Sequence, residues 1–439
     1  MSDEASYQEP VRGLSPSIIQ WVILGLLLLL SAIPIFSDGI TAIRAVLTVL
    51  MVGMWALWVW LQPQGGQGLV IPLLAILVSF LLGGIVLLFT ARDTVGIMLP
   101  FADRLIIVRD GLIALIDGAF LRPRAFSDTL VSATPLILTG LSVAVAFRAG
   151  LFNIGAEGQF LIGAVAAAFI GYAVNLPPVL HAIVCILAGA AGGALWGFIP
   201  GILKARLGAH EVINTIMMNF IAIFLTDWLV SGPMRDPGSS FARTPSIFPS
   251  AQLPQLGEVF PNVFGASDQL HIGFVLAILA AFGMWWLINK TTVGFELRTT
   301  GSNPDAAQYA GVRVERNVIL AMTLAGALAG LAGAIEVQGL NRNLAQFFAA
   351  GYGFDAIAVA LLAQNNPIGI IPAGIMFGAL TTGSAILQIR TGVSADIVLI
   401  IQALILLFVA APEVIRWLFR LRVEKSTLEE VPLTRGWGG

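Results

Sequence analysis

Charged residues and cysteine are scarce in this chain, and each shortage excludes a class of protein structure. Only 11% of its 439 residues are charged and 57% are hydrophobic, with a mean hydropathy of +0.90, whereas soluble domains carry about 25% charged residues. The single cysteine, Cys185, excludes a disulfide within the chain, and its apolar surroundings predict a buried thiol. A net charge of -2 gives no reason to expect a nucleic-acid polymer as partner. The composition predicts a polytopic protein that contacts membrane lipid.

Motifs of catalysis and cofactor binding are also missing. No glycine is followed by lysine, so the phosphate-binding loop of ATPases is absent. The stretch HEVIN begins like a zinc-protease helix, but Asn214 stands where the second histidine is needed. The stretch GYGFDA fails as a dinucleotide loop because it ends in Ala356. We therefore expect no catalytic residue, no metal site and no cofactor in this chain, and transport rather than an enzymatic reaction.

Long apolar segments are what the chain has instead. A spanning helix needs about 20 mostly apolar residues. The polar, acidic start is unlike the basic beginning of a cleaved signal peptide, so the first apolar segment is expected to be retained. Expected spans lie at 18–36, 40–61, 69–89, 130–147, 150–173, 178–203, 212–231, 271–289, 317–338, 368–388 and 394–418, and 353–364 is either a twelfth span or a half-helix. The sequence predicts an all-α transmembrane helical bundle of about 10–12 spans, with broken or short helices.

The distribution of basic residues predicts which loops face the cytoplasm. Lysine and arginine are frequent in the loop 290–316, in the turn after residue 203 and in the C-terminal tail, whereas the loop 232–270 has only Arg235 and Arg243. Cytoplasmic loops are enriched in these residues. We expect the first three segments inside, the loop 232–270 outside, and both termini in the cytoplasm.

Residues 90–129 balance their arginines with aspartates. Asp103, Asp110 and Asp117 recur at the same interval with apolar stretches between them, which places the carboxylates along one helical face. An amphipathic helix on the outer leaflet is the favoured interpretation, and a further packed helix of the bundle is the alternative. The expected division is an N-terminal part, 1–129, with a cytoplasmic tail, three spans and this external segment; a core, 130–418; and a cytoplasmic tail, 419–439.

Glycines spaced four apart predict close helix packing, as at Gly189 and Gly193, Gly326 and Gly330, and Gly374 and Gly378. Small residues at this spacing let helix backbones approach in lipid.

Two polar interruptions stand out among the apolar segments. The stretch RAGLFNIGAEGQFLIG, 148–163, combines polar side chains with glycines that weaken a helix, and 351–369 repeats the pattern. Broken helices in a membrane line a cavity or are buried in protein, and transporters place them around the substrate. One interpretation is therefore that these segments line a substrate route. The other is a purely structural role, in which Glu157 pairs with Arg148 or caps a half-helix. Glu336 and Asp227 are further candidates, but each is near an expected helix end, and reaching the membrane interface is the favoured interpretation. The candidates for the route are Asn153, Glu157, Gln159, Asp355, Asn365 and Asn366.

Four motifs, in this order, carry a resemblance to a known family: RAGLFNIGAEGQFLIGA, GILKARLGAHEVINTIMMNFIA, LRTTGSNPDAAQYAGV and GFDAIAVALLAQNNPIGIIPAGIMFG. Over about 130–412 the chain resembles permease subunits of bacterial ATP-binding-cassette importers, in the branch for simple sugars and nucleosides. The resemblance implies a multi-pass protein of the bacterial inner membrane. It also implies a separate ATPase that holds ATP and Mg, a second related permease chain, as heterodimer or homodimer, and an extracytoplasmic substrate-binding protein.

The stretch SNPDAAQYAG resembles the cytoplasmic coupling loop of these permeases, whose pattern is Glu-Ala-Ala, three residues, Gly. Aspartate replaces glutamate here, follows Pro304 at the start of a short helix and suits its positive end. Ala306, Ala307 and Ala310 are expected to give this helix a slim surface that docks on the ATPase. The expected coupling loop comprises Gly301, Asn303, Asp305, Ala306, Ala307 and Gly311.

The resemblance also favours a solute. GLFNIGAEGQ is more similar to nucleoside-type than to ribose-type permeases, and uncharged amides suit a neutral solute rich in hydrogen-bonding groups. A nucleoside importer is the main prediction, with a pentose or hexose importer as the alternative. An ion-coupled secondary transporter is the remaining hypothesis and would use carboxylates such as Glu157 or Glu336.

Overall fold

Apolar helices dominate the structure and confirm the all-α prediction. The computed structural model describes residues 67–90, 99–259, 268–348 and 351–419, so the expected spans 18–36 and 40–61 lie outside the described part. Eight helices in the described part are long and apolar enough to cross a membrane. The α-helices are α3 (Gln67–Thr90), α4 (Phe101–Ile116), α5 (Ala125–Arg148), α6 (Ala156–Ala173), α7 (Leu180–Leu207), α8 (Glu211–Ser231), α9 (Leu256–Val259), α10 (Gly273–Lys290), α11 (Thr292–Ser302), α12 (Pro304–Tyr309), α13 (Val314–Glu336), α14 (Tyr352–Leu362), α15 (Ile370–Thr391), α16 (Ile397–Ala410) and α17 (Pro412–Leu418). Short π and 3-10 segments are η2 (Asp117–Leu121), η3 (Pro249–Ala251) and η4 (Val337–Asn341).

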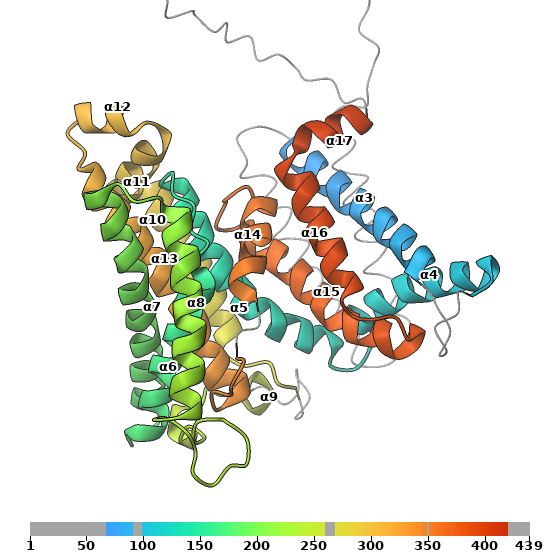
Figure 1. Ribbon diagram of the computed structural model, residues 1–439, viewed down its shortest axis with the longest axis horizontal. Helices are drawn as coiled ribbons and strands as arrows, with labels where there is room; N and C mark the ends of the chain where they lie inside the picture. The colour runs from blue at the N-terminus through green and yellow to red at the C-terminus, as the bar shows by residue number, and fades with distance from the viewer. Residues whose placement is uncertain (1–66, 91–98, 260–267, 349–350, 420–439) are drawn as a thin grey trace, which may run out of the picture.

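The helices form two groups joined through α5 (Figure 1). One group contains α6, α7, α8, α10 and α13, and the other contains α3, α4, α15 and α16. α5 packs against α13 and α10 on one side and against α15 and α14 on the other, and it is the most buried of the candidate spans. The short helix α14 therefore lies at the centre of the molecule, against α5.

The glycine pairs pack helices closely, as predicted. A Cβ added to Gly193 in α7 would strike the carbonyl oxygen of Gly326 in α13, and one added to Gly330 would strike the carbonyl oxygen of Gly189. Gly378 meets the backbone of Thr129 and Ala133 in α5 in the same way. At these crossings the two backbones are in direct contact, which dispersion alone can stabilise in lipid.

Two expected spans differ in the structure. The segment 394–418 is not one straight span, because α16 ends at Ala410 and α17 leaves at an angle of 88°. Pro412 opens α17, where its missing N–H is harmless, and it could not continue α16. The expected span 150–173 begins only at Ala156, after a turn.

α14 resolves the alternative left open for 353–364. It has eleven residues, about 16 Å of helix, whereas the hydrocarbon core of a membrane is about 30 Å thick. It is a half-helix.

The segment α4 packs with one side on the bundle. Gly111, Ala114 and Leu115 are buried, and a Cβ on Gly383 of α15 would strike the carbonyl oxygen of Leu115. Asp117 pairs with Arg122 at 3.0 Å and with Arg390 of α15. Phe101, Leu105 and Ile113 are exposed. A place on the outer leaflet stays a prediction.

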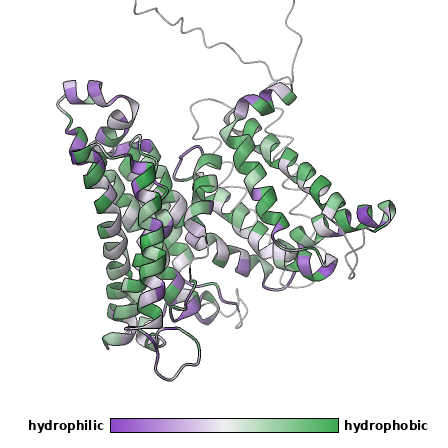
Figure 2. Cartoon of the chain, in the orientation of Figure 1, coloured by the Kyte–Doolittle hydropathy of each residue, from purple (hydrophilic) through white to green (hydrophobic). Residues whose placement is uncertain are grey.

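Hydrophilic residues gather at the two ends of the helices. Figure 2 shows the hydrophilic colouring on α11 and α12 at one end and on the loop after α8 at the other. The end with α12 also carries the last turn of α7, with Lys204 and Arg206, and the helix α17. The basic segments thus share one end, as expected, and which side of the membrane that end faces stays a prediction.

Candidate functional site

Two interrupted helices meet end to end beside α5. The first is α6, which is separated from α5 by the turn 149–155, and the second is α14. We call the meeting place, residues 153–159 and 351–355, the half-helix junction. A Cβ on Gly353 would strike the backbone of Glu157, so the two helix beginnings are in backbone contact.

Glu157 caps α14 across this junction. Its carboxylate is buried and accepts hydrogen bonds from the backbone N–H of Gly351 at 3.0 Å and of Gly353 at 2.6 Å. The first N–H groups of a helix have no partner within it, and an acid there also meets the positive end of the dipole. Of the two structural roles considered for Glu157, capping a half-helix is the one the structure shows.

Arg148 occupies the opposite end of α14. Its Nε donates to the carbonyl oxygen of Asn365 at 3.0 Å, where a cation meets the negative end of the helix dipole. Gln364 and Asn365 both adopt left-handed backbone conformations, with φ of +52° and +56°. One short stretch of sequence, 148–157, therefore holds α14 at both ends.

The predicted route residues do not form one cluster. Asp355 lies in the first turn of α14, beside Glu157, whereas Asn365 and Asn366 follow its last turn. The part of α14 from Asp355 to Leu362, about 10 Å of helix, separates Asp355 from the two asparagines. Asn153, Glu157 and Gln159 gather at the junction, and the two asparagines lie at the far end of the half-helix.

A buried amide network fixes the start of α6. Asn153 donates to Gln159 at 3.0 Å and accepts from the N–H of Gly155 at 3.0 Å. Asn219 of α8 accepts from the N–H of Gly158 and donates to the carbonyl of Ile154, both at 2.8 Å. These amides satisfy the backbone groups that the broken helix leaves free. The sequence analysis missed Asn219, although a lone amide inside an apolar span is a costly residue that could have marked it.

The expected coupling segment forms α11 and α12. The Asn303 side chain accepts from the N–H of Ala306 at 3.0 Å and begins α12, and Pro304 follows as its first residue. Gly311 ends this segment in a left-handed conformation with φ of +82°. The start and end of the short helix are therefore as predicted.

The outer surface of α12 differs from the expected one. Ala307 is fully buried within the chain, so its placement on a docking surface was wrong. A six-residue helix turns one side inward, and here that side carries Ala307. Asp305, Ala306 and Ala310 are exposed, and so is the ring of Tyr309, at 97%.

The coupling segment touches the turn between α5 and α6. A Cβ on Gly301 would strike the carbonyl oxygen of Arg148, and one on Gly150, whose φ is +74°, would lie 2.9 Å from the Cα of Gly301. Only glycine fits such a backbone contact. A displacement of α11 and α12 would therefore act directly on the stretch that holds α14.

Three further ionisable residues occupy separate places. Glu336, the last residue of α13, is buried and accepts from Asn341 at 3.1 Å, and its place at the membrane interface stays a prediction. Glu211 of the HEVIN stretch pairs with Lys204 at 2.7 Å across the turn between α7 and α8. Asp227 lies in the last turns of α8 and accepts from the N–H of Phe347 at 3.1 Å.

A half-helix that meets the broken start of a spanning helix inside an apolar bundle is typical of membrane transport proteins. The chain belongs to the family described as branched-chain amino acid transport system / permease component, which matches residues 125–410. This range nearly coincides with the range of the resemblance inferred from the sequence, about 130–412.

Curated relatives are permease proteins of ATP-binding-cassette transporters. The guanosine ABC transporter permease protein NupP of Bacillus subtilis is 42% identical over 350 residues, 80% of this chain and 95% of the relative. The glucose ABC transporter permease protein TsgB13 of Haloferax volcanii is 38% identical over 291 residues, 65% of this chain and 76% of the relative. The nucleoside ABC transporter permease protein NupB of Lactococcus lactis is 36% identical over 352 residues, 79% of this chain and 91% of the relative. No solved structure matches the chain.

Proposed function

We propose that this chain is the transmembrane permease subunit of an ATP-driven, binding-protein-dependent importer of nucleosides. The observation that carries the proposal is the 42% identity to a guanosine permease over 95% of that protein's length.

ATP hydrolysis takes place on a separate ATPase chain, which docks on α12. The exposed side of α12, with Asp305, Ala306, Tyr309 and Ala310, is the docking surface. Its movement passes through the Gly301 and Gly150 contact to residues 148–157 and from there to α14. A second related permease completes the route, and an extracytoplasmic binding protein delivers the solute to the end that carries residues 232–259.

The solute passes the junction side of α14. Glu157 and Asp355 stand at the outer end of the half-helix and Asn365 and Asn366 at its inner end, so the six predicted route residues mark its two ends. A half-helix held by two hydrogen bonds to Glu157 at one end and by one from Arg148 at the other can change position without unfolding a long span, which suits a gate.

A test of the function is uptake by cells that lack this chain. Deletion is expected to abolish ATP-dependent accumulation of labelled guanosine and uridine and to leave glucose and ribose uptake unchanged. Complementation with the intact chain restores nucleoside uptake.

A sugar importer is the second candidate, supported by the 38% identity to a glucose permease. Loss of glucose or ribose uptake with intact nucleoside uptake in the deletion strain would select it. The shorter overlap with that relative, 76% of its length against 95% for the guanosine permease, favours the nucleoside.

A further inference from the structure

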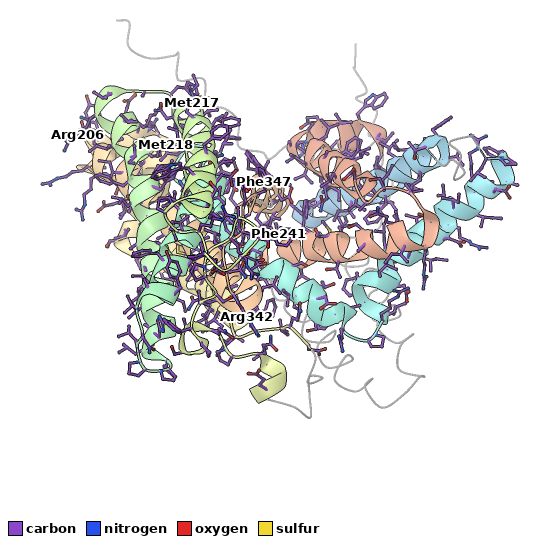
Figure 3. All side chains as sticks on the ribbon, turned by 60° about the horizontal axis from the view of Figure 1, so that its bottom comes forward. Arg206, Met217, Met218, Phe241, Arg342 and Phe347 are labelled. Carbon is purple, nitrogen blue, oxygen red and sulfur yellow. The ribbon has the colours of Figure 1, made fainter. Side chains whose placement is uncertain are left out.

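A small cavity lies near the end of α8 that carries Asp227. Its volume is about 110 Å³, and it is lined by Leu161, Ile223, Thr226, Asp227, Phe347 and Phe348. The lining comes from α6, from α8 and from the segment that follows η4. Figure 3 shows Phe347 on the side of α8 that faces the second group of helices.

The polar side of this cavity has unused hydrogen-bonding capacity. Thr226 is 1% exposed, and its hydroxyl oxygen has no partner among the described residues. One oxygen of Asp227 accepts from the N–H of Phe347, and the other has no hydrogen bond within the described part of the chain. A buried hydroxyl without a partner costs free energy, so a ligand with donors and acceptors would satisfy it.

The apolar side presents an aromatic ring to solvent. Phe347 is 76% exposed and has a left-handed backbone with φ of +59°, which is rare for a bulky residue. Its segment is held in place by hydrogen bonds from Gln346 N–H to Ala242 at 2.9 Å and from Thr244 N–H to Leu344 at 2.9 Å. The surrounding structure thus holds the backbone of Phe347 in an unfavourable conformation, a feature that clusters at ligand sites.

The cavity adjoins the half-helix junction. The ring of Phe348 stacks on that of Phe160 with centroids 5.7 Å apart, and Phe160 meets Tyr352 of α14 at the same distance. Leu161 lies one helical turn beyond Glu157. A ligand in the cavity would therefore rest just outside the cap of α14.

We propose that this cavity is a nucleoside-binding subsite in which Asp227 and Thr226 bind the ribose hydroxyls and Phe347 stacks on the base. The inference rests on the proposed function and deepens it. An ionised carboxylate only accepts, so it selects a ligand with hydroxyl donors, and an exposed ring provides a stacking surface for any base. The volume is below the 300–1,000 Å³ of pockets that enclose whole ligands. The cavity holds the sugar, and the base extends over Phe347.

The test compares guanosine with 2′,3′-dideoxyguanosine, which lacks the 2′ and 3′ hydroxyl donors and keeps the 5′ hydroxyl. Uptake of each is measured with the complete complex in proteoliposomes, with the same loaded binding protein for every variant, so that a changed ratio belongs to the permease. The variants are Asp227→Asn, which keeps an acceptor for the Phe347 N–H, Thr226→Val and Phe347→Ala. The matched control is Phe282→Ala, which removes a half-exposed ring of α10 outside the cavity.

We expect the intact complex to take up guanosine faster than the dideoxy compound. The ratio of the two uptake rates should fall about tenfold in Asp227→Asn and in Thr226→Val, because each variant loses a hydrogen bond to a charged or buried group. Phe347→Ala is expected to slow uptake of both compounds about tenfold, and Phe282→Ala to change neither. Guanosine uptake with an unchanged ratio and rate in all three variants would overturn the subsite and leave the importer intact. An unchanged ratio together with loss of the second permease from the purified complex would make the cavity a subunit interface and also overturn the subsite. If the intact complex takes up no nucleoside, the proposed function itself fails.

Discussion

At the scale of single residues, Glu157 is the most consequential side chain of the structure. It satisfies two N–H groups at the start of α14, and its neighbours in sequence satisfy the start of α6. Because α14 has only eleven residues, its own hydrogen bonds are few and its ends decide its stability. Glu157 belongs to α6 in sequence, and its side chain stabilises the start of α14.

Replacing Glu157 by Gln is expected to lower uptake strongly while the assembled complex still hydrolyses ATP. The amide keeps one acceptor but turns an N–H₂ group toward a backbone N–H, which costs about 1–3 kcal/mol at a buried site. Labelled-nucleoside uptake and ATPase activity of the same proteoliposomes measure the two effects. Glu413→Gln, at an exposed glutamate of α17, is the control and should leave both unchanged. Normal uptake by Glu157→Gln would mean that transport does not depend on this cap.

The sequence predicted which residues break the helices but not which of them meet. Glycines and polar side chains marked both interruptions, because a helix in lipid cannot carry them without compensation. Asn365 and Asn366 were grouped with Asp355 because they are near in sequence, whereas the helix between them places them at opposite ends. Asn219 joins the site from α8, and no pattern in one sequence pairs it with Ile154 and Gly158.

At the scale of elements, α12 is the helix through which movement of the ATPase is expected to reach the permease. Its borders followed from Asn303, Pro304 and Gly311, whose conformational preferences are local and readable in sequence. The orientation of α12 could not be predicted from the sequence, because the side that turns inward depends on contacts with α11 and α13. The buried Ala307 shows the difference.

Ala306→Arg and Ala310→Arg are expected to abolish uptake and weaken co-purification of the ATPase while the permease stays inserted. Both alanines are exposed, so the new charge enters the interface rather than the fold, and an unpaired charge there costs several kcal/mol. Gln308→Ala, at an exposed neighbour, is the mild control. In contrast, Ala307→Arg should lower the amount of folded permease, since no space exists for it. Full uptake and full ATPase association in both surface variants would remove α12 as the docking element.

At the scale of the whole molecule, the two ends of the bundle have different characters. Lys204, Arg206 and the loop 290–316 share the end with α12, and the loop after α8 packs on the segment 342–346 at the other end. The positive-inside rule assigns the first end to the cytoplasm. We therefore expect the binding protein and the ATPase to act on opposite ends of the bundle, connected through α14.

A cysteine at Ser240 tests this orientation. Ser240 is exposed in the loop after α8, and the native Cys185 is fully buried, so background labelling should be low. An impermeant thiol reagent is expected to label Ser240→Cys in intact cells, and a cysteine at Ser302, exposed beside α12, only after lysis. The reverse pattern would invert the topology.

ATP-driven nucleoside uptake by the purified complex tests the central claim most directly. The permease, its second permease chain, the ATPase and the loaded binding protein are combined in proteoliposomes, and labelled guanosine, glucose and ribose are offered in turn. Our account predicts accumulation of guanosine that requires hydrolysable ATP and the binding protein and persists when ion gradients are collapsed. Accumulation of the sugars alone, or uptake driven by an ion gradient without ATP, would contradict it.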